Sequence, residues 1–456
     1  MKKWNRLLIG MGAVLTAWSC MAADKPNIVL FFVDDLGWSD VGYRNPDFES
    51  PNIDRLSRDG LNFEQAYIAT PTCSPSRGTL LTGKHPARLK MVRHISNNPK
   101  SVVFVKDEDG VERTHLLKTD PAQFPSANWL NLDAPTYPEI LRKQGYTTLH
   151  VGKWHLGYGE EHASRQYGYD REIGTVYAPR NNYYPADYQT TIKPRESDEL
   201  YRTDMLTDGA VEFIETHDKD QPFLMSFCYY AVHSPHAGRK DLVKHFEERG
   251  FSGGYAHYLA MLTSVDQSIG RVRGALKKQG LEKNTIIIFL SDQGGIFENK
   301  PFHGGKMVDT LYEGGARVPF IFYWPGVTEA GAANNSLVQS TDLFPTILEM
   351  IGEDATKFAP LDGVSLLSTI RNNSELERGE PLFGYRAYED LYASVREGDW
   401  KLLAYRSGIV KLYNIPNDIG EKNDLAASNP EKVQELTTKL MAWEKEMGVE
   451  KYSGVQ

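Results

Sequence analysis

Residues 71–83, PTCSPSRGTLLTG, place a cysteine and an arginine one helical turn apart. The residue types predict a tight turn followed by a helix, which Ser74 can cap and in which Pro75 suits the first position. Cys73 then lies just before the helix, where free N–H groups and the helix dipole favour an anion. The guanidinium of Arg77 can return to the same point. We therefore expect a reactive side chain in an anion-attracting setting; the alternative is a buried cysteine near a helix cap.

Oxygen-bearing side chains follow two apolar runs that predict buried strands. Asp34 and Asp35 follow the first run, and Asp292 and Gln293 follow the second. Open α/β sheets bind ligands at the carboxyl edge, so we expect these side chains to meet there. Oxygen ligands suit a hard divalent cation, Ca²⁺ or Mg²⁺, rather than Zn²⁺. The alternative is that the two aspartates form a turn or a helix cap.

Basic side chains follow two further predicted strands. If strand geometry continues beyond the first, Lys153 and His155 point to one face and Trp154 to the other, where it can pack. His233 follows the second strand, and His236, close behind it, can be purely structural. The alternative for the first pair is a surface lysine and a structural histidine.

The pattern Cys-x-Pro-Ser-Arg-x-x-x-Leu-Thr-Gly, which begins at Cys73, resembles the signature of the type I sulfatases in the alkaline phosphatase superfamily. The resemblance covers nearly all of the chain after its first 23 residues. It implies that a formylglycine-generating maturation enzyme oxidises Cys73 to 3-oxoalanine (Cα-formylglycine). It also implies a fold with a large α/β domain and a small C-terminal domain that contains an antiparallel sheet.

The resemblance also implies one bound Ca²⁺ ion. Its ligands would be Asp34, Asp35, Asp292 and Gln293, together with the modified Cys73. The family more often has Asn or His at the position of Gln293, although Gln can supply the same carbonyl on a longer arm.

The remaining implied roles concern catalysis. Lys153 and Lys306 would bind the sulfate oxygens, and Arg77 and His155 would contact the formylglycine. His233 would protonate the leaving oxygen. We therefore expect a sulfatase that acts on sulfated sugars. The alternatives are a phosphonate or phosphate ester hydrolase of the same superfamily and a non-enzymatic protein that binds sulfated glycans.

Specificity commonly resides in irregular stretches, so we searched these for polar side chains that could contact a sugar. Each candidate can equally be a solvated surface residue. The candidates are Arg88, Arg93, His94, Arg180, Asn181, Asn182, His236 and His303.

Apolar strands alternate with helices over most of the chain, which predicts an α/β fold with a mostly parallel central sheet. The expected strands are residues 27–33, 61–67, 146–151, 223–231, 285–290 and 318–323. The expected helices are residues 51–59, 136–144, 202–216, 255–279 and 341–351. We predict residues 84–133 to be a long irregular insertion that faces the substrate.

The pattern changes after about residue 375. Strands at 393–405 and 410–415 and a helix at 431–447 predict a small α+β domain. We thus expect a signal peptide at 1–23, a catalytic domain at 24–375 and a C-terminal domain at 376–456. A chain of 456 residues is long enough for two such units.

Residues 1–23 combine Lys2, Lys3 and Arg6 with an apolar run and small residues, which predicts an exported protein, periplasmic or secreted. Removing these three positive charges takes the net charge from −9 to −12, which excludes a nucleic-acid partner on bulk charge. The alternative for the N-terminus is a lipoprotein anchored through Cys20, the one case in which we expect membrane association. Cys228 lies in an apolar strand, so Cys73 has no evident disulfide partner.

Overall fold

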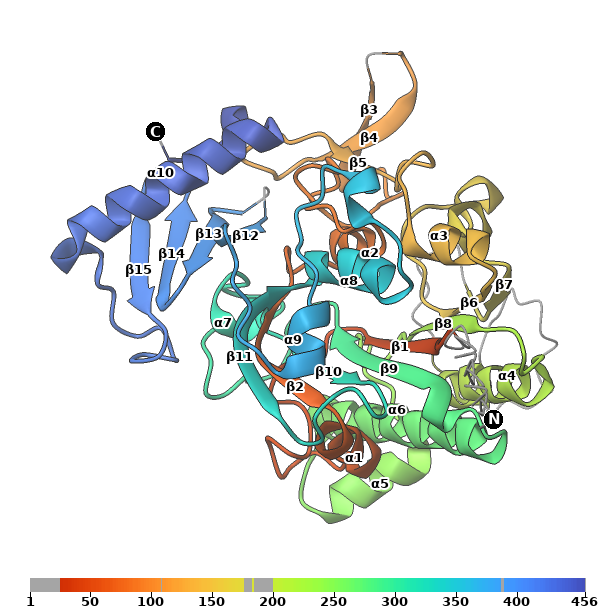
Figure 1. The fold of residues 1–456 in the computed structure, drawn as a ribbon. Helices are drawn as coiled ribbons and strands as arrows, with labels where there is room; N and C mark the ends of the chain where they lie inside the picture. The colour runs from red at the N-terminus through yellow and green to blue at the C-terminus, as the bar shows by residue number, and fades with distance from the viewer. Residues whose placement is uncertain (1–24, 108, 176–182, 184–199, 387–388, 456) are drawn as a thin grey trace, which may run out of the picture.

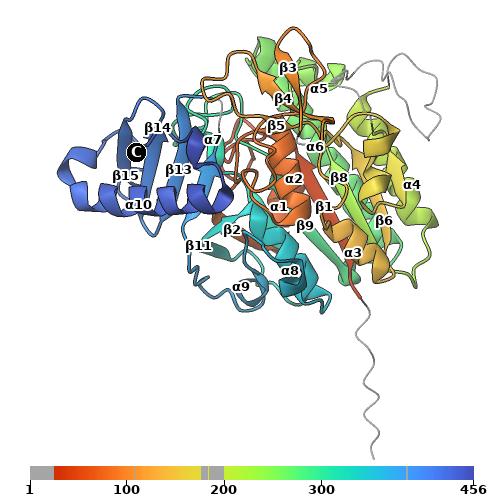
Figure 2. The same ribbon diagram turned by 90° about the horizontal axis from the view of Figure 1, so that it is seen from above.

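The computed structural model describes residues 25–107, 109–175, 183, 200–386 and 389–455. A large sheet flanked by helices forms most of this part, and a smaller sheet with its own helix lies to one side (Figures 1 and 2). Among the described residues, no helix combines the length and apolarity needed to cross a membrane. The predicted signal peptide and Cys20 lie outside the described residues.

The large sheet has eight strands in the order β11-β2-β10-β9-β1-β8-β6-β7. Neighbouring strands pair in parallel except around β10, which runs antiparallel to β2 and β9. The strands are β1 (Asn27–Val33), β2 (Leu61–Tyr67), β6 (Thr147–Gly152), β7 (Arg171–Ile173), β8 (Phe223–Cys228), β9 (Thr285–Ser291), β10 (Phe320–Tyr323) and β11 (Ala333–Gln339). The predicted α/β fold with a mostly parallel sheet is confirmed.

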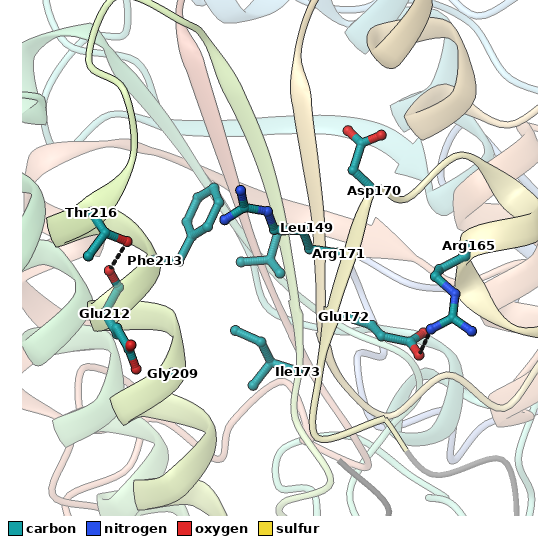
Figure 3. Close-up of a pocket in the computed structure, with 10 residues that line it drawn as sticks. All are labelled: Leu149, Arg165, Asp170, Arg171, Glu172, Ile173, Gly209, Glu212, Phe213 and Thr216. Atoms are coloured by element: carbon teal, nitrogen blue, oxygen red, sulfur yellow. Dashed lines mark hydrogen bonds and ion pairs between the residues drawn. The ribbon is translucent and has the colours of Figure 1, made fainter. Parts of the chain in front are cut away.

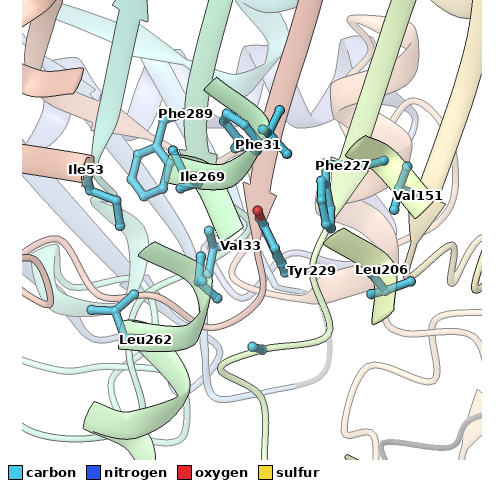
Figure 4. Packing of buried hydrophobic residues seen from close by; sticks show 14 of the residues in the cluster. Phe31, Val33, Ile53, Val151, Leu206, Phe227, Tyr229, Leu262, Ile269 and Phe289 are labelled. Atoms are coloured by element: carbon cyan, nitrogen blue, oxygen red, sulfur yellow. The ribbon is translucent and has the colours of Figure 1, made fainter. Parts of the chain in front are cut away.

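Both faces of this sheet are covered, because its central strands are apolar on both sides. Alternate residues of β1 enter two separate cores, the second of which is shown in Figure 4. The first set is Ile28, Leu30 and Phe32, and the second is Val29, Phe31 and Val33. One core is covered by α2 (Cys73–Thr82), α3 (Tyr137–Lys143), α8 (Leu343–Met350) and α9 (Leu367–Asn372). The other is covered by α1 (Pro51–Asp59), α4 (Arg202–Thr216), α5 (Lys240–Glu248) and α6 (Gly253–Lys278).

The C-terminal part forms an antiparallel sheet of β12 (Leu382–Tyr385), β13 (Leu391–Glu397), β14 (Trp400–Tyr405) and β15 (Val410–Asn414). Helix α10 (Pro430–Met447) covers it (Figure 1). The helix packs through Leu436, Leu440 and Trp443, which join the buried residues of the sheet in one core. The exact domain boundary at residue 375 stays a prediction.

Two expectations about local structure were wrong. Residues 84–133 contain a three-stranded sheet, β3 (Val102–Lys106), β4 (Glu112–Leu117) and β5 (Ser126–Ala127). The polar sequence of β4, ERTHLL, gives little strand signal, whereas β3, VVFVK, is apolar and could have been recognised as a strand, although only Val102 of it is buried. Helix α5 was also missed. Finally, α2 begins at Cys73, and Ser74 does not cap it: the Ser74 hydroxyl accepts the backbone N–H of Ile95 at 3.1 Å.

Candidate active site

Four adjacent strands, β9, β1, β8 and β6, end at the same edge of the large sheet and deliver most of the predicted site residues. Asp34, Asp292 and Lys153 directly follow three of these strands. Backbone hydrogen bonds continue past the strand ends: Asp292 N–H donates to Val33 O at 3.1 Å, and Lys153 N–H donates to Cys228 O at 2.8 Å. The strand ends therefore hold the first residues of these loops at the spacing of the sheet.

Cys73 reaches the same place from the first turn of α2. Its Sγ lies within 4.8 Å of carboxylate oxygens of both Asp34 and Asp292. The same sulfur also lies within 4.8 Å of a carboxylate oxygen of Asp35 and a ring nitrogen of His233. Helix α2 and the edge of the sheet thus converge on the sulfur of Cys73, a residue that is 7% exposed.

Three cations and three carboxylates alternate around Cys73. Arg77 Nη2 lies 3.1 Å from Asp292 Oδ2 and 3.5 Å from Asp34 Oδ1. The Lys153 ammonium forms an ion pair with Asp34, and the Lys306 ammonium forms one with Asp35. Three negative and three positive charges sum to zero, so a bound divalent cation would leave the site positive and ready for an anion.

The pKa values of this cluster follow from burial and from these neighbours. Burial acts to raise the pKa of Asp34, but Lys153, His233 and Arg77 outweigh it and hold that pKa well below its ordinary value. Burial, together with the charge of Asp34, raises the pKa of Asp292. Two carboxylates this close repel one another unless a further cation lies between them.

The donor atoms fit a hard divalent cation. Asp34 Oδ1 is buried without a hydrogen-bond partner, so it retains an acceptor that a cation can use. Asp35 and Asp292 supply further carboxylate oxygens beside it. The Gln293 amide lies at the same point, with Nε2 2.6 Å from Asp35 Oδ1. Rotating the amide by half a turn would offer its carbonyl oxygen there instead, as an oxygen-ligated ion such as Ca²⁺ requires.

His155 reaches the site by a route that the sequence did not predict. Strand geometry does not continue beyond β6, because Gly152 has φ +89° and His155 itself has φ +59°. The ring nevertheless lies close enough for Lys153 and Arg77 to act on it: burial first, and then these cations, lower its pKa well below the ordinary value. His155 Nδ1 is buried without a hydrogen-bond partner, so a neutral ring has a nitrogen available to receive a proton. Trp154 packs in the core, as predicted.

His233 follows β8, the strand next to β1, and lies beside Asp35. Its Nε2 is 3.8 Å from Asp35 Oδ2, and burial lowers its pKa. Tyr183 fixes the backbone here by donating its hydroxyl to the carbonyls of Tyr230 at 2.6 Å and His233 at 2.9 Å. The backbone of His233 is therefore held in place by a residue that lies 50 positions earlier in the chain.

The thiol of Cys73 is protonated in this environment. Burial raises its pKa to about 12, and the nearby carboxylates add to the rise while Lys153 opposes it. The position at a helix N-terminus, which by itself would favour a thiolate, does not overcome these effects. Unmodified Cys73 is therefore poorly suited to act as a thiolate nucleophile near neutral pH.

The predicted sugar-contact arginines have structural partners. Arg93 is 1% exposed, contacts Asp120 and donates to Phe124 O at 2.7 Å. Arg88 lies 2.6 Å from Asp362 and takes part in a contact with α10. These contacts give both arginines a role in holding the fold together.

The predicted histidines lie in different settings. His94 is exposed and within electrostatic reach of Lys153 and Lys306. The His236 ring packs against Tyr258, and the His303 ring pairs with Asp309 at 2.8 Å. The other candidates, Arg180, Asn181 and Asn182, lie outside the described residues.

The sequence did not reveal two residues, Tyr258 and Asp40, that form hydrogen bonds with the turn containing Asp35. The Tyr258 hydroxyl lies 2.6 Å from Asp40 Oδ2 and 3.2 Å from Asp35 O, and the Asp40 carboxylate accepts Gly37 N–H at 3.0 Å. These contacts fix the turn that carries Asp34 and Asp35. Tyr258 comes from α6, and nothing in the local sequence marks it as different from the apolar residues around it.

A separate cavity of about 370 Å³ lies between α4 and β7 (Figure 3). Its floor is apolar, with Leu149, Ile173 and Phe213, and an Arg165–Glu172 pair lies at its rim. None of the residues that converge on Cys73 lines this cavity. The convergent cluster at the carboxyl edge of the sheet, rather than this cavity, is therefore the candidate active site.

Comparison with known proteins agrees with this geometry. A family model described as Sulfatase matches residues 26–353, and one described as N-sulphoglucosamine sulphohydrolase, C-terminal, matches residues 306–447. N-acetylgalactosamine-6-sulfatase from Mus musculus is 31% identical over 82% of this chain and 72% of its own length. A protein described as Sulfatase from Formosa agariphila is 29% identical over 92% of this chain and 89% of its own length.

Among solved structures, that of Ps i-CgsB in complex with k-i-k-neocarrahexaose superposes with a TM-score of 0.79. It is 29% identical, and the match covers 93% of this chain and 94% of that one. The similarity therefore extends over both the large sheet and the C-terminal sheet.

Proposed function

This chain belongs to the sulfatase family of sulfuric ester hydrolases, and we propose that it removes O-sulfate groups from sugars with a formylglycine at position 73 and one Ca²⁺ ion. One observation carries the proposal: Cys73 is a buried residue that lies among three carboxylates and three cations. A cysteine in this setting is a poor thiolate nucleophile, whereas its oxidised form, formylglycine, can act as the nucleophile there.

The sugar substrate is supported by the relatives. The mouse relative is by name a sulfatase of N-acetylgalactosamine, and the solved Ps i-CgsB structure holds an oligosaccharide. Both matches extend along most of this chain. We infer a sulfated saccharide as the substrate class, without assigning the sugar or the position of its sulfate.

The proposal requires two further groups, a hydrated formylglycine and a Ca²⁺ ion. Hydrated formylglycine would supply one hydroxyl that takes the sulfuryl group from the sugar oxygen and a second whose deprotonation lets sulfate leave as the aldehyde returns. Ca²⁺ would be held by Asp34, Asp35, Asp292 and Gln293, where it would favour the ionised hydroxyl and withdraw charge from the sulfate. A maturation enzyme that oxidises Cys73 is a necessary partner.

The side chains of this chain then divide the work. Lys153 and Lys306 hold the sulfate oxygens, and Arg77 keeps Asp34 and Asp292 in place beside the nucleophile. These cations are already oriented by their carboxylate partners, so little reorganisation is needed when charge develops on the sulfate.

Two histidines move the protons. His233 gives a proton to the sugar oxygen as the S–O bond to the sugar breaks. The negative charge of the bound sulfate favours the protonated form of His233, which burial alone disfavours. Neutral His155 takes the proton from the second hydroxyl, since its Nδ1 has no competing hydrogen bond in the structure.

The relatives favour sulfate over phosphate as the group removed, because the family model and the relatives that match most of this chain are described as sulfatases.

We also propose that the protein is exported, as residues 1–23 indicate by composition. Association with a membrane would require a lipid on Cys20.

The test is a hydrolysis assay on the mature protein with defined sulfated saccharides, an aryl sulfate and the matched aryl phosphate, with sulfate or phosphate release measured in each case. We expect turnover of at least one saccharide and a kcat/KM for the aryl sulfate far above that for the aryl phosphate. Preference for the phosphate would move the protein to the other reaction class of this fold. Binding of saccharides without release of sulfate, by protein with fully formed formylglycine, would indicate a binding protein instead.

A further inference from the structure

The loop that carries Lys306 is fastened to the loop that carries Gln293 through the short helix α7 (Glu313–Ala316). Gly314 N–H donates to His303 O at 2.7 Å, and Gly294 N–H donates to Gly315 O at 2.9 Å. Lys306 N–H donates to Gly295 O at 3.0 Å and closes the set. We call residues 293–295, 303–306 and 313–316 the α7 plate.

The α7 plate is held backbone against backbone. A Cβ on Gly294 would lie 2.0 Å from Gly314 O, and a Cβ on Gly314 would lie 2.3 Å from Gly304 O. No side chain can separate these segments without moving them. A shift of α7 would therefore be passed to Gln293 and Lys306 together.

Helix α7 is in turn held by charges from the C-terminal sheet. Glu313 Oε1 lies 2.8 Å from Lys401 Nζ on β14, and Lys401 Nζ lies 2.9 Å from Glu421 Oε1. Glu421 Oε2 accepts the backbone N–H of Glu313 at 2.7 Å. The side chains of Glu313 and Glu421 are fully buried and that of Lys401 is 2% exposed.

The large domain completes the cluster from the other side. The Tyr67 hydroxyl donates to Glu313 Oε2 at 2.8 Å, and Arg317 Nη1 donates to the same oxygen at 3.2 Å. Glu313 is thereby fixed by groups from β2, from its own helix and from β14. Two carboxylates and two ammonium or guanidinium groups balance one another in a site without solvent.

We propose that Lys401 on β14 and Glu421, which follows β15, are positioning residues for the active site, acting through Glu313 and the α7 plate on Lys306 and Gln293. Neither side chain touches the cluster around Cys73. Their effect is to fix α7 in the one orientation in which Lys306 reaches Asp35 and Gln293 reaches Cys73. The roles of Lys306 in binding sulfate and of Gln293 in binding the metal rest on the proposed function. The contacts that join Lys401 and Glu421 to these residues through α7 do not depend on it.

A buried ion cluster suits such a role because it tolerates few arrangements. Replacing a buried ion pair with neutral groups of similar size often costs little stability, whereas removing one partner leaves an uncompensated charge and costs several kcal/mol. A charge-balanced double substitution therefore separates positioning from folding.

The variant is Lys401→Met with Glu421→Gln, which leaves Glu313 paired with Arg317. The matched control is Lys439→Met with Glu397→Gln, which removes a 2.6 Å ion pair between α10 and β13, at the surface of the same sheet and away from α7. Lys401→Arg keeps the positive charge and tests rescue. Should the double variant fail to fold, Glu421→Gln alone loosens the same contact to Glu313.

Amide hydrogen exchange, followed by mass spectrometry, measures directly whether the α7 plate is loosened in the variant. We expect peptides within residues 293–316 to exchange at least tenfold faster in the double variant, with β1 unchanged, and the control and Lys401→Arg to resemble the wild type. KM for a sulfate ester should rise at least fivefold in the double variant, with a smaller fall in kcat, because Lys306 binds the ester throughout the reaction.

The outcomes separate the two proposals. Unchanged exchange in residues 293–316, or equal effects in variant and control, would overturn the positioning role. Faster exchange in these residues in a protein that hydrolyses no sulfate ester would leave the mechanical link standing and count against the proposed function alone.

Discussion

The Gln293 amide nitrogen lies 3.1 Å from the sulfur of Cys73. The first residue follows β9 and the second opens α2, so this contact joins the metal-site edge of the sheet to the nucleophile position. The same nitrogen lies 2.6 Å from Asp35 Oδ1. An ion bound by these side chains would therefore touch the reacting group itself, which makes activity depend directly on the ion.

Removal of the metal is the first test of that dependence. We expect exhaustive chelation to abolish hydrolysis and added Ca²⁺ to restore it, because clustered buried carboxylates repel one another without a cation. Asp292→Ala should weaken Ca²⁺ binding, measured by calorimetry, by more than the roughly 10–100-fold typical of outer-shell partners. Asp34→Ala should do the same. Full activity after chelation, in protein with no metal by elemental analysis, would contradict the assignment.

His233 has a role that depends on the leaving group. We expect His233→Ala to reduce kcat/KM for a sugar sulfate by roughly 10²–10⁴-fold, the usual contribution of a general acid. Nitrophenyl sulfate should lose far less, because nitrophenolate departs without a proton. Steady-state kinetics of the two substrates with one enzyme preparation gives the ratio. Equal losses on both would remove His233 from this role.

A buried carboxyl in the C-terminal helix contributes to the way in which stability depends on pH. Glu444 on α10 is 1% exposed, and burial raises its pKa to about 7 from the usual 4.5. The native state then binds more protons than the unfolded state between these values, so stability falls as the pH rises through this range. The difference corresponds to about 3 kcal/mol lost between pH 4 and pH 8.

Glu444→Gln removes this titration while keeping the shape of the side chain. Chemical denaturation at pH 5, 6, 7 and 8 should show that the variant gains free energy of unfolding relative to the wild type as the pH rises. A constant difference between the two proteins across these pH values would show that Glu444 titrates alike in both states.

The sheet and most site residues could be predicted because their signals are local. A run such as residues 27–33 is apolar at every position, which only a strand buried on both faces explains, and Asp34 follows it directly. The strand ends of β1 and β9 therefore predicted where Asp34 and Asp292 would meet. The segment around Cys73 could be recognised from its sequence motif, although the motif did not predict that α2 begins at Cys73 itself.

Other parts of the site depend on long-range contacts that leave no local pattern. His155 reaches Lys153 through the positive φ of Gly152, which a strand-based reading cannot anticipate. Lys401 and Glu421 look like ordinary surface charges in the sequence, and only the docking of the C-terminal sheet on α7 buries them. Tyr258 resembles the apolar residues of α6 in the sequence, and only the structure shows that its hydroxyl donates to the backbone carbonyl of Asp35.

Cys73 provides the decisive test of the proposed chemistry. In protein from a host with a maturation enzyme, mass spectrometry of the peptide spanning residues 70–77 should detect formylglycine at position 73, and the specific activity of each batch should follow its fraction. Cys73→Ala should fold with a stability change within the usual range of point mutants, since Cys73 is small and pairs with no other cysteine in the described structure. It should have no turnover, because alanine cannot form the hydrated aldehyde.

The same variant should still bind its substrate, because the cations that hold sulfate remain. Lys153, Lys306 and Arg77 keep their carboxylate partners in Cys73→Ala, and each of those pairs forms without the thiol. Calorimetry with a sulfated saccharide should thus detect binding without hydrolysis. Cys73→Ser should be nearly inactive unless the host's maturation enzyme accepts serine. Fully active protein with an unmodified thiol at position 73, or wild-type turnover by Cys73→Ala, would refute the formylglycine mechanism, because neither side chain can form the hydrated aldehyde.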